Sequence, residues 1–180
     1  RARVERFFTL HNLARAVVKP AAGGSSIGVF SVATAAEAWE RMEHIWREKL
    51  HDSVLLEPFC RGREFTVLVM EGADGKPVAL VPTEIEMNYG ASEVFDFRRK
   101  YLPSTFVRYH CPPRFTPEVI ARIRQEAEAI FSHFGARDFL RIDGWWLDDG
   151  RLLFSDINPI SGMEQNSFVF QQAAWLGYAQ

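Results

Sequence analysis

Two stretches of the chain repeat apolar residues with the three-to-four-residue spacing of a helix. Residues 34–50 begin with Thr34 and Glu37, which have the spacing of a capping box. Residues 116–135 carry Pro117 at the first helical position, where a missing N–H leaves no hydrogen bond unmade. The pattern therefore predicts two helices whose apolar faces contribute to a core.

Runs rich in β-branched and aromatic residues predict strands in most of the remaining chain. The Asp-Gly pairs of MEGADGKPV and LDDGRL predict hairpin turns, because glycine readily adopts positive φ angles. Hairpins with interspersed helices and no βαβ alternation indicate an α+β fold. The long segment 88–115 is typical of a functional lid or an insert. The predicted strands cover residues 6–10, 16–20, 28–32, 54–58, 64–72, 77–87, 138–147 and 151–158.

The length, hydrophobic content, net charge and cysteine count indicate which classes of protein are compatible with the sequence. The 180 residues are 47% hydrophobic with a net charge of -2, which predicts a folded domain with two lobes and gives no reason to expect a nucleic-acid or membrane partner. Two cysteines, Cys60 and Cys111, fit a reducing compartment, so we expect a cytoplasmic protein. The start without Met and the helix-like ending FQQAAWLGYAQ suggest a piece of a longer protein.

The segment RIDGWWLDDGRLLFSDIN reads as a hairpin with acids near its open end. If its turn is centred on the Asp-Gly pair, Asp143 opposes Asp156 and Arg141 opposes Asn158, all on one face. Two carboxylates and an amide favour Mg²⁺ or Mn²⁺ over Zn²⁺, and a guanidinium suits phosphate oxygens. The alternative is an ordinary solvated sheet face.

A glycine-rich loop follows an apolar strand in AVVKPAAGGSSIGVFSV. Such a loop can direct N–H groups and hydroxyls toward phosphates, although it is neither a Walker A loop nor G-x-G-x-x-G. A flexible turn is the alternative. Lys19 favours the phosphate interpretation, because a lysine within a strand of valines needs a partner.

Acids also flank the link between two apolar strands in VLLEPFCRGREFTVLVM. Glu57 ends the first strand and Glu64 begins the second. Because Pro58 has no N–H, Phe59 or Cys60 must supply any backbone donor to a flat ring. The alternative is that Phe59 is an ordinary residue of the hydrophobic core.

Together these segments resemble the ATP-grasp superfamily, and within it the D-alanine–D-alanine ligases. The resemblance rests, in order along the chain, on VVKPAAGGSSIGV, EPFCRGREFTV, RRKYL, RID and DINPISGMEQNSF. It implies an ATP-grasp fold of two α+β lobes whose antiparallel sheets clamp a nucleotide. Residues 1–60 would belong to the central lobe and 61–180 to the C-terminal lobe, and the family's N-terminal lobe has no counterpart.

The resemblance also implies a role for each matching residue. Nucleotide contacts would come from Lys19, Gly24, Ser25, Ser26, Gly28, Glu57, Phe59, Cys60, Glu64 and Lys100. Catalysis would involve Arg141, Ser26, Lys100 and Tyr101, with the last two on a mobile lid. Two Mg²⁺ ions, or Mn²⁺ instead, would be bound by Asp143, Asp156 and Asn158. The second substrate would meet Gly162, Glu164 and Ser167.

The implied activity is an ATP-dependent carboxylate–amine ligase, in which an acyl-phosphate forms and an amine then displaces phosphate. Its partners would be small molecules, an amino acid or other carboxylate and an amine, and a homodimer is left open. A non-catalytic or regulatory ATP-binding module is the main alternative, and a kinase of the same fold is another.

Two departures from the family pattern bear on the substrate. Asp156 stands where the family usually has Glu, and Glu164 brings a charge close to the second-substrate site. A pocket for D-alanine has no evident use for Glu164. We therefore hypothesise a different amine or amino acid as acceptor.

Overall fold

The chain forms two compact units, with boundaries after Cys60, after Glu86 and after Val107. The computed structural model describes residues 1–23, 26–87, 107–164 and 167–177. Within these residues, no helix is long and apolar enough to cross a membrane.

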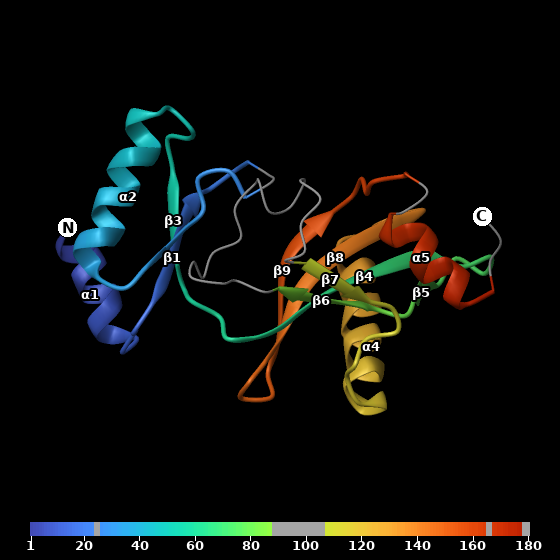
Figure 1. Ribbon diagram of the computed structural model, residues 1–180. Coiled ribbons are helices and arrows are strands. Elements are labelled where there is room, and N and C mark those ends of the chain that lie inside the picture. The colour runs from blue at the N-terminus through green and yellow to red at the C-terminus, as the bar shows by residue number, and fades with distance from the viewer. Residues whose placement is uncertain (24–25, 88–106, 165–166, 178–180) are drawn as a thin grey trace. The chain divides into compact units, whose positions relative to one another are not determined.

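The first unit is a small antiparallel sheet packed against a helix (Figure 1). Its strands are β1 (Ala16–Pro20), β2 (Phe30–Val32) and β3 (Val54–Pro58), in the order β2-β1-β3. Its helices are α1 (Ala2–Leu10) and α2 (Ala35–Arg47). The predicted capping box forms, since Thr34 Oγ1 accepts from Glu37 N at 3.1 Å and Glu37 Oε2 accepts from Ala33 N at 2.8 Å. The buried core is Val4, Ala16, Val18, Val32, Ala38, Met42 and Ile45.

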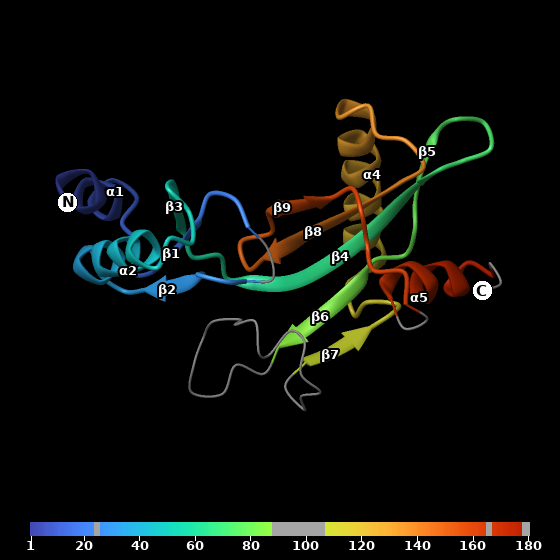
Figure 2. The same cartoon turned by 90° about the horizontal axis from the view of Figure 1, so that it is seen from above.

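The second unit is built on a larger antiparallel sheet in the order β7-β6-β4-β8-β9, with β5 paired to one end of β4 (Figure 2). The strands are β4 (Gly62–Glu71), β5 (Pro77–Ala79), β6 (Thr83–Met87), β7 (Val107–His110), β8 (Phe139–Leu147) and β9 (Leu152–Asn158). The helices are α4 (Pro117–His133) and α5 (Phe168–Trp175).

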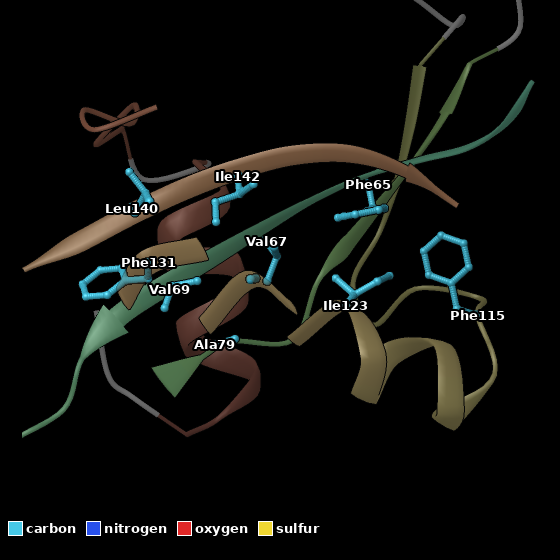
Figure 3. Packing of buried hydrophobic residues seen from close by; sticks show 10 residues of the cluster. Phe65, Val67, Val69, Ala79, Phe115, Ile123, Phe131, Leu140 and Ile142 are labelled. Carbon is cyan, nitrogen blue, oxygen red and sulfur yellow. The ribbon is translucent and has the colours of Figure 1, made fainter. Parts of the chain in front are cut away.

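Helix α4 covers one face of this sheet and forms its core (Figure 3). Phe65 and Val67 of β4 and Ile142 of β8 pack there against Ile123 and Phe131 of α4. Side chains alternate along a strand, so the residues between these apolar positions point to the opposite face. The face beneath α4 is largely apolar, and the opposite face, called the polar face below, carries Glu64, Thr66, Arg141 and Asp143.

Three of the predicted strands are wrong in type or extent. Residues 6–10 belong to helix α1, because Val4 and Phe8 lie one helical turn apart and together join the first unit's core. The strand predicted for 77–87 is two strands, interrupted near Pro82, which has no N–H for a ladder. Strand β2 begins at Phe30 instead of 28, since Gly28 has a φ of +75°.

A strand was missed inside the segment 88–115. Val107–His110 form β7 at the edge of the large sheet. The segment's mixed composition concealed this short strand. Residues 88–106 lie outside the described part of the chain, so the predicted lid stays a prediction.

Candidate nucleotide and metal site

The four polar residues predicted at the open end of the β8–β9 hairpin do oppose one another. Asp143 pairs with Asp156 and Arg141 with Asn158, as predicted. These positions alternate with Ile142, which lies in the core beneath α4. The carboxylates therefore lie on the polar face of the large sheet.

The hairpin reaches this pairing through a different turn from the predicted one and through a bulge. Near the turn Trp146 pairs with Leu152, so three residues, 148–150, connect the strands instead of two. A bulge at Ser155 adds one residue to β9 between Phe154, which pairs with Gly144, and Asp156. The longer turn and the bulge cancel, and the predicted register returns at the acids.

Asp143 is the centre of a hydrogen-bond network. Its Oδ1 accepts from Thr66 Oγ1 at 2.7 Å and from Arg141 Nε at 3.1 Å. Its Oδ2 accepts from Arg141 Nη2 at 3.0 Å and Asn158 Nδ2 at 3.1 Å. The Asp143 and Arg141 side chains are only 17% and 18% exposed. Partners on three strands thus fix the carboxylate in one orientation.

The donor atoms at this site have the chemistry of a magnesium site. Asp156, across the ladder, is exposed, and Asn158 retains Oδ1 as a ligand atom while Nδ2 points to Asp143. Oxygen ligands of this kind suit Mg²⁺. No group of three or more His, Cys, Asp or Glu that could hold a metal occurs among the described residues. A metal at this site would therefore rely on two carboxylates, an amide and its own ligands.

Glu64 lies on the same polar face, two residues before Thr66 on β4. It pairs with Trp145 on β8 and Ile85 on β6. Burial and the Glu64 carboxylate both raise the pKa of Tyr109 on β7 above its ordinary value of 10.0. The Glu64 carboxylate is therefore near enough to Tyr109 to act on it electrostatically.

The other predicted nucleotide residues belong to the first unit. Lys19 Nζ lies 2.7 Å from Glu57 Oε2, across the β1–β3 ladder. The two side chains are 30% and 46% exposed. The partner expected for a lysine in this strand is thus a carboxylate of the neighbouring strand.

The glycine loop and the link between β3 and β4 are described in part. Ser26 and Gly28 have positive φ angles of 59° and 75°. A Cβ on Gly28 would lie 3.0 Å from side-chain atoms of Pro20 and Leu50, so the loop needs glycine there. Phe59 N donates to Arg15 O at 3.2 Å, which occupies one of the two donors predicted for a nucleotide ring.

The loop after β9 holds the three residues predicted to contact the second substrate. Glu164 folds back over Gly162, where an added Cβ would lie 2.5 Å from Glu164 Oε2. Ser167 N donates to Glu164 O at 2.8 Å. Ser161 is 5% exposed, and within the described chain the buried hydroxyls of Ser161 and Ser167 have no hydrogen-bond partner. Buried hydroxyls of this kind are suited to a polar ligand.

Four predicted residues lie outside the described part of the chain: Gly24, Ser25, Lys100 and Tyr101. The predicted site residues also fall into two sets, one in each unit. Lys19 and Glu57 belong to the first, and Glu64, Arg141 and the acids to the second.

Sequence reasoning missed three residues beside these positions. Thr66 could have been found, because it lies two residues after Glu64 and thus on the same strand face. Gln172 is fully buried, accepting from Leu68 N at 2.9 Å and donating to Thr66 O and Thr83 Oγ1 at 3.1 Å. The sequence signal was the pair Gln171 and Gln172 in a helix whose other residues are apolar. No feature of the sequence indicated Tyr109.

Residues 11–179 match the family described as "D-ala D-ala ligase C-terminus". The chain therefore belongs to this family, as the motifs indicated. A D-alanine–D-alanine ligase of Arthrobacter sp. (strain FB24) is 35% identical over 167 residues, which are 91% of this chain and 43% of that protein. The chain thus spans less than half the length of this relative.

Solved structures agree with this assignment. D-alanyl-alanine synthetase A of Vibrio cholerae has a TM-score of 0.82 at 24% identity, covering 98% of this chain and 51% of that one. The VanG D-Ala:D-Ser ligase of Enterococcus faecalis has a TM-score of 0.79 at 25% identity, covering 97% and 48%. The α+β, ATP-grasp fold implied by the sequence is confirmed.

Proposed function

We propose that the protein is an ATP-dependent carboxylate–amine ligase, which forms an amide or dipeptide bond. The geometry around Asp143 supports this proposal most directly. A carboxylate held by Arg141, Thr66 and Asn158, with Asp156 across the ladder, gathers metal ligands and a phosphate-binding guanidinium on one sheet face. Membership of the ligase family supports the same chemistry.

In this proposal each unit contains residues with nucleotide-binding roles. Lys19 leaves its ion pair with Glu57 and contacts the phosphates of the nucleotide instead. Ser26 and Gly28 belong to the glycine loop that covers these phosphates. Glu64 accepts from the ribose hydroxyls. Gly24, Ser25, Cys60, Lys100 and Tyr101 have the nucleotide and lid roles that the family motifs imply.

Asp143, Asp156 and Asn158 would hold two Mg²⁺ ions, which would neutralise charge on the phosphates. Asp156 is shorter by one methylene than the Glu usual at this position. The Asp143 carboxylate is already oriented by three partners, so metal binding would require little reorganisation of this residue.

The reaction we propose has two steps. A carboxylate oxygen of the first substrate attacks the γ-phosphorus of ATP, and ADP leaves with the electrons of the broken P–O bond. The amine of the second substrate then attacks the acyl carbon, loses a proton, and expels inorganic phosphate. Arg141 stabilises the transferring phosphoryl group and the developing oxyanion.

We further propose that the acceptor is an amino acid other than D-alanine. Ser167 would bind its carboxylate, and Glu164 beside Gly162 would accept from a donor group on it. VanG of Enterococcus faecalis has the same fold and is a D-Ala:D-Ser ligase, so the choice of acceptor differs within the fold.

Product analysis with the full-length protein tests the proposal. ATP, Mg²⁺ and a panel of amino acids should yield ADP, phosphate and an amide. A stable phosphorylated product would instead indicate a kinase, and nucleotide binding without turnover a non-catalytic module. Strict preference for D-alanine would refute the hypothesis about the acceptor.

A further inference from the structure

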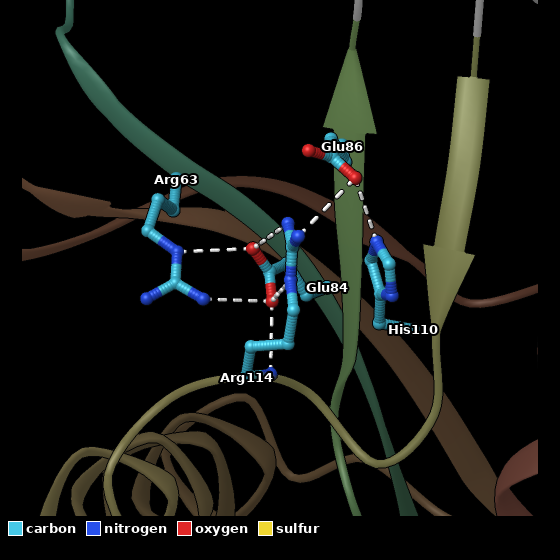
Figure 4. A network of polar contacts seen from close by, with 5 residues as sticks. All are labelled: Arg63, Glu84, Glu86, His110 and Arg114. Carbon is cyan, nitrogen blue, oxygen red and sulfur yellow. Dashed lines mark hydrogen bonds and ion pairs between the residues drawn. The ribbon is translucent and has the colours of Figure 1, made fainter.

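Glu84 lies at the centre of a second polar network (Figure 4). Because Glu84 pairs with Phe65, it lies on the face of the large sheet opposite to Asp143. Its carboxylate accepts from Arg63 Nε at 2.9 Å and Arg63 Nη2 at 2.8 Å. Arg114 adds its backbone N–H at 2.9 Å, Nη2 at 2.9 Å and Nε at 3.2 Å. Glu84 on β6 thereby connects β4 to the loop that leads into α4.

A peripheral pair extends this network along β6 and β7. Glu86 Oε2 lies 2.8 Å from His110 Nε2 and 3.3 Å from Arg114 Nη1. Hydrogen bonding to His110 lowers the pKa of Glu86. The network thus connects β4, β6 and β7 at the edge of the sheet.

The Glu84 side chain is 2% exposed, whereas those of Arg63 and Arg114 are 42% and 49% exposed. A buried carboxylate is stable only while its partners remain in place. Arg63 is also fixed from its other side, because its guanidinium lies 4.3 Å from the centre of the Phe115 ring. The arrangement allows one register between β4 and β6.

That register sets the neighbour of Glu64 on the β6 side. Glu84 pairs with Phe65, and the next pair along the ladder is Ile85 with Glu64. Arg63 directly precedes Glu64 in the chain. Glu64 also pairs with Trp145 of β8, so a slip of β6 by one residue would leave Glu64 on its face but would change the residue beside it from Ile85.

We propose that Glu84 is a positioning residue, which determines nucleotide affinity by holding Ile85 beside Glu64 through Arg63 and Arg114. The proposal rests on the proposed function, because it requires Glu64 to bind the ribose. Glu84 itself faces away from the nucleotide and takes no part in the chemistry.

The test compares Glu84→Gln with Glu71→Gln in the full-length protein. Glu71 is a matched control, because it lies at the far end of β4 and binds Arg137 Nε at 3.0 Å and Asp138 N at 3.2 Å. We expect Glu84→Gln to raise the KM for ATP about tenfold and to change kcat less than about threefold. Glu71→Gln should leave the KM for ATP unchanged.

Two further variants complete the design. Glu84→Asp keeps the charge and should restore part of the ATP affinity, and Arg63→Lys keeps its charge but loses the bidentate contact and should raise the KM. These variants keep the test decisive if Glu84→Gln does not fold. An unchanged KM for ATP in folded variants, or an equal rise for Glu71→Gln, would overturn the proposal. Failure of the wild-type protein to bind ATP would instead refute the proposed function.

Discussion

Protonation of Glu84 should remove a defined part of the stability of the second unit. Burial alone would raise the pKa of this carboxyl, but hydrogen bonds from the side chain and backbone of Arg114 and from Arg63 outweigh burial and lower it from 4.5 to about 2. The folded-state pKa is therefore below the unfolded one. The corresponding stabilisation is complete above pH 4.5 and is lost as the pH falls toward 2.

The size of this stabilisation follows from the shift. About 2.5 pKa units at about 1.36 kcal/mol each give about 3 kcal/mol at neutral pH. Glu84→Gln removes this dependence, because glutamine does not titrate. The difference in free energy of unfolding between wild type and variant should thus be largest above pH 5 and should shrink as the pH falls toward 2.

The assay needs a signal from the second unit alone. Two of the five tryptophans, Trp39 and Trp46, lie in the first unit, and the others in the second. In a Trp39→Phe/Trp46→Phe background, urea unfolding followed by tryptophan fluorescence at pH 7, 5, 4 and 3 therefore reports the second unit.

A constant difference between Glu84→Gln and its background from pH 7 to pH 3 would refute the linkage argument. At pH 7 the Trp39→Phe/Trp46→Phe protein should have a larger free energy of unfolding than the same protein with Glu84→Gln. A smaller value would also refute the argument, because the charged carboxylate would then destabilise the fold.

Three further predictions concern the large sheet. Gln172→Leu removes the hydrogen bonds of Gln172 to Leu68 N, Thr66 O and Thr83 Oγ1. It should lower the free energy of unfolding by about 2–4 kcal/mol, with faster hydrogen exchange at the amide of Leu68. Gly144→Ala should destabilise the sheet by about 1–3 kcal/mol, measured by urea unfolding, because its Cβ would meet the Leu153 carbonyl and lie 2.8 Å from the Phe65 ring. Thr66→Val removes a donor to Asp143 and should cost about 1 kcal/mol of stability, but weaken Mg²⁺-dependent ATP binding several-fold by calorimetry.

The two-residue periodicity of strands predicted the sheet face on which Asp143 and Asp156 lie. It did not predict the turn and the bulge that produce their pairing. The pairing of Asp143 with Asp156 follows from period two and an approximately symmetric hairpin. Whether the turn has two or three residues depends on small differences in backbone energy that tertiary packing can override. A compensating bulge at Ser155 is not encoded by any pattern of hydrophobic residues.

Local sequence pattern also gave wrong or no predictions where contacts between distant residues determine the structure. Residues 6–10 contain β-branched and aromatic side chains, yet they are helical because Val4 and Phe8 pack on the first unit's core. Glu84 resembled an ordinary strand carboxylate. Its importance depends on Arg63 and Arg114, which lie 21 and 30 residues away in the chain.

Calorimetric titration of the chain with ATP tests the central claim most directly, with and without Mg²⁺ and with Asp143→Asn as the comparison. We expect the wild-type chain to bind ATP with an affinity that Mg²⁺ increases at least about tenfold, since the metal neutralises phosphate charge beside the Asp143 carboxylate. Asp143→Asn should fold and should lose this increase. Binding that is absent in the folded wild type, or that Mg²⁺ strengthens equally in Asp143→Asn, would contradict the assignment of the site.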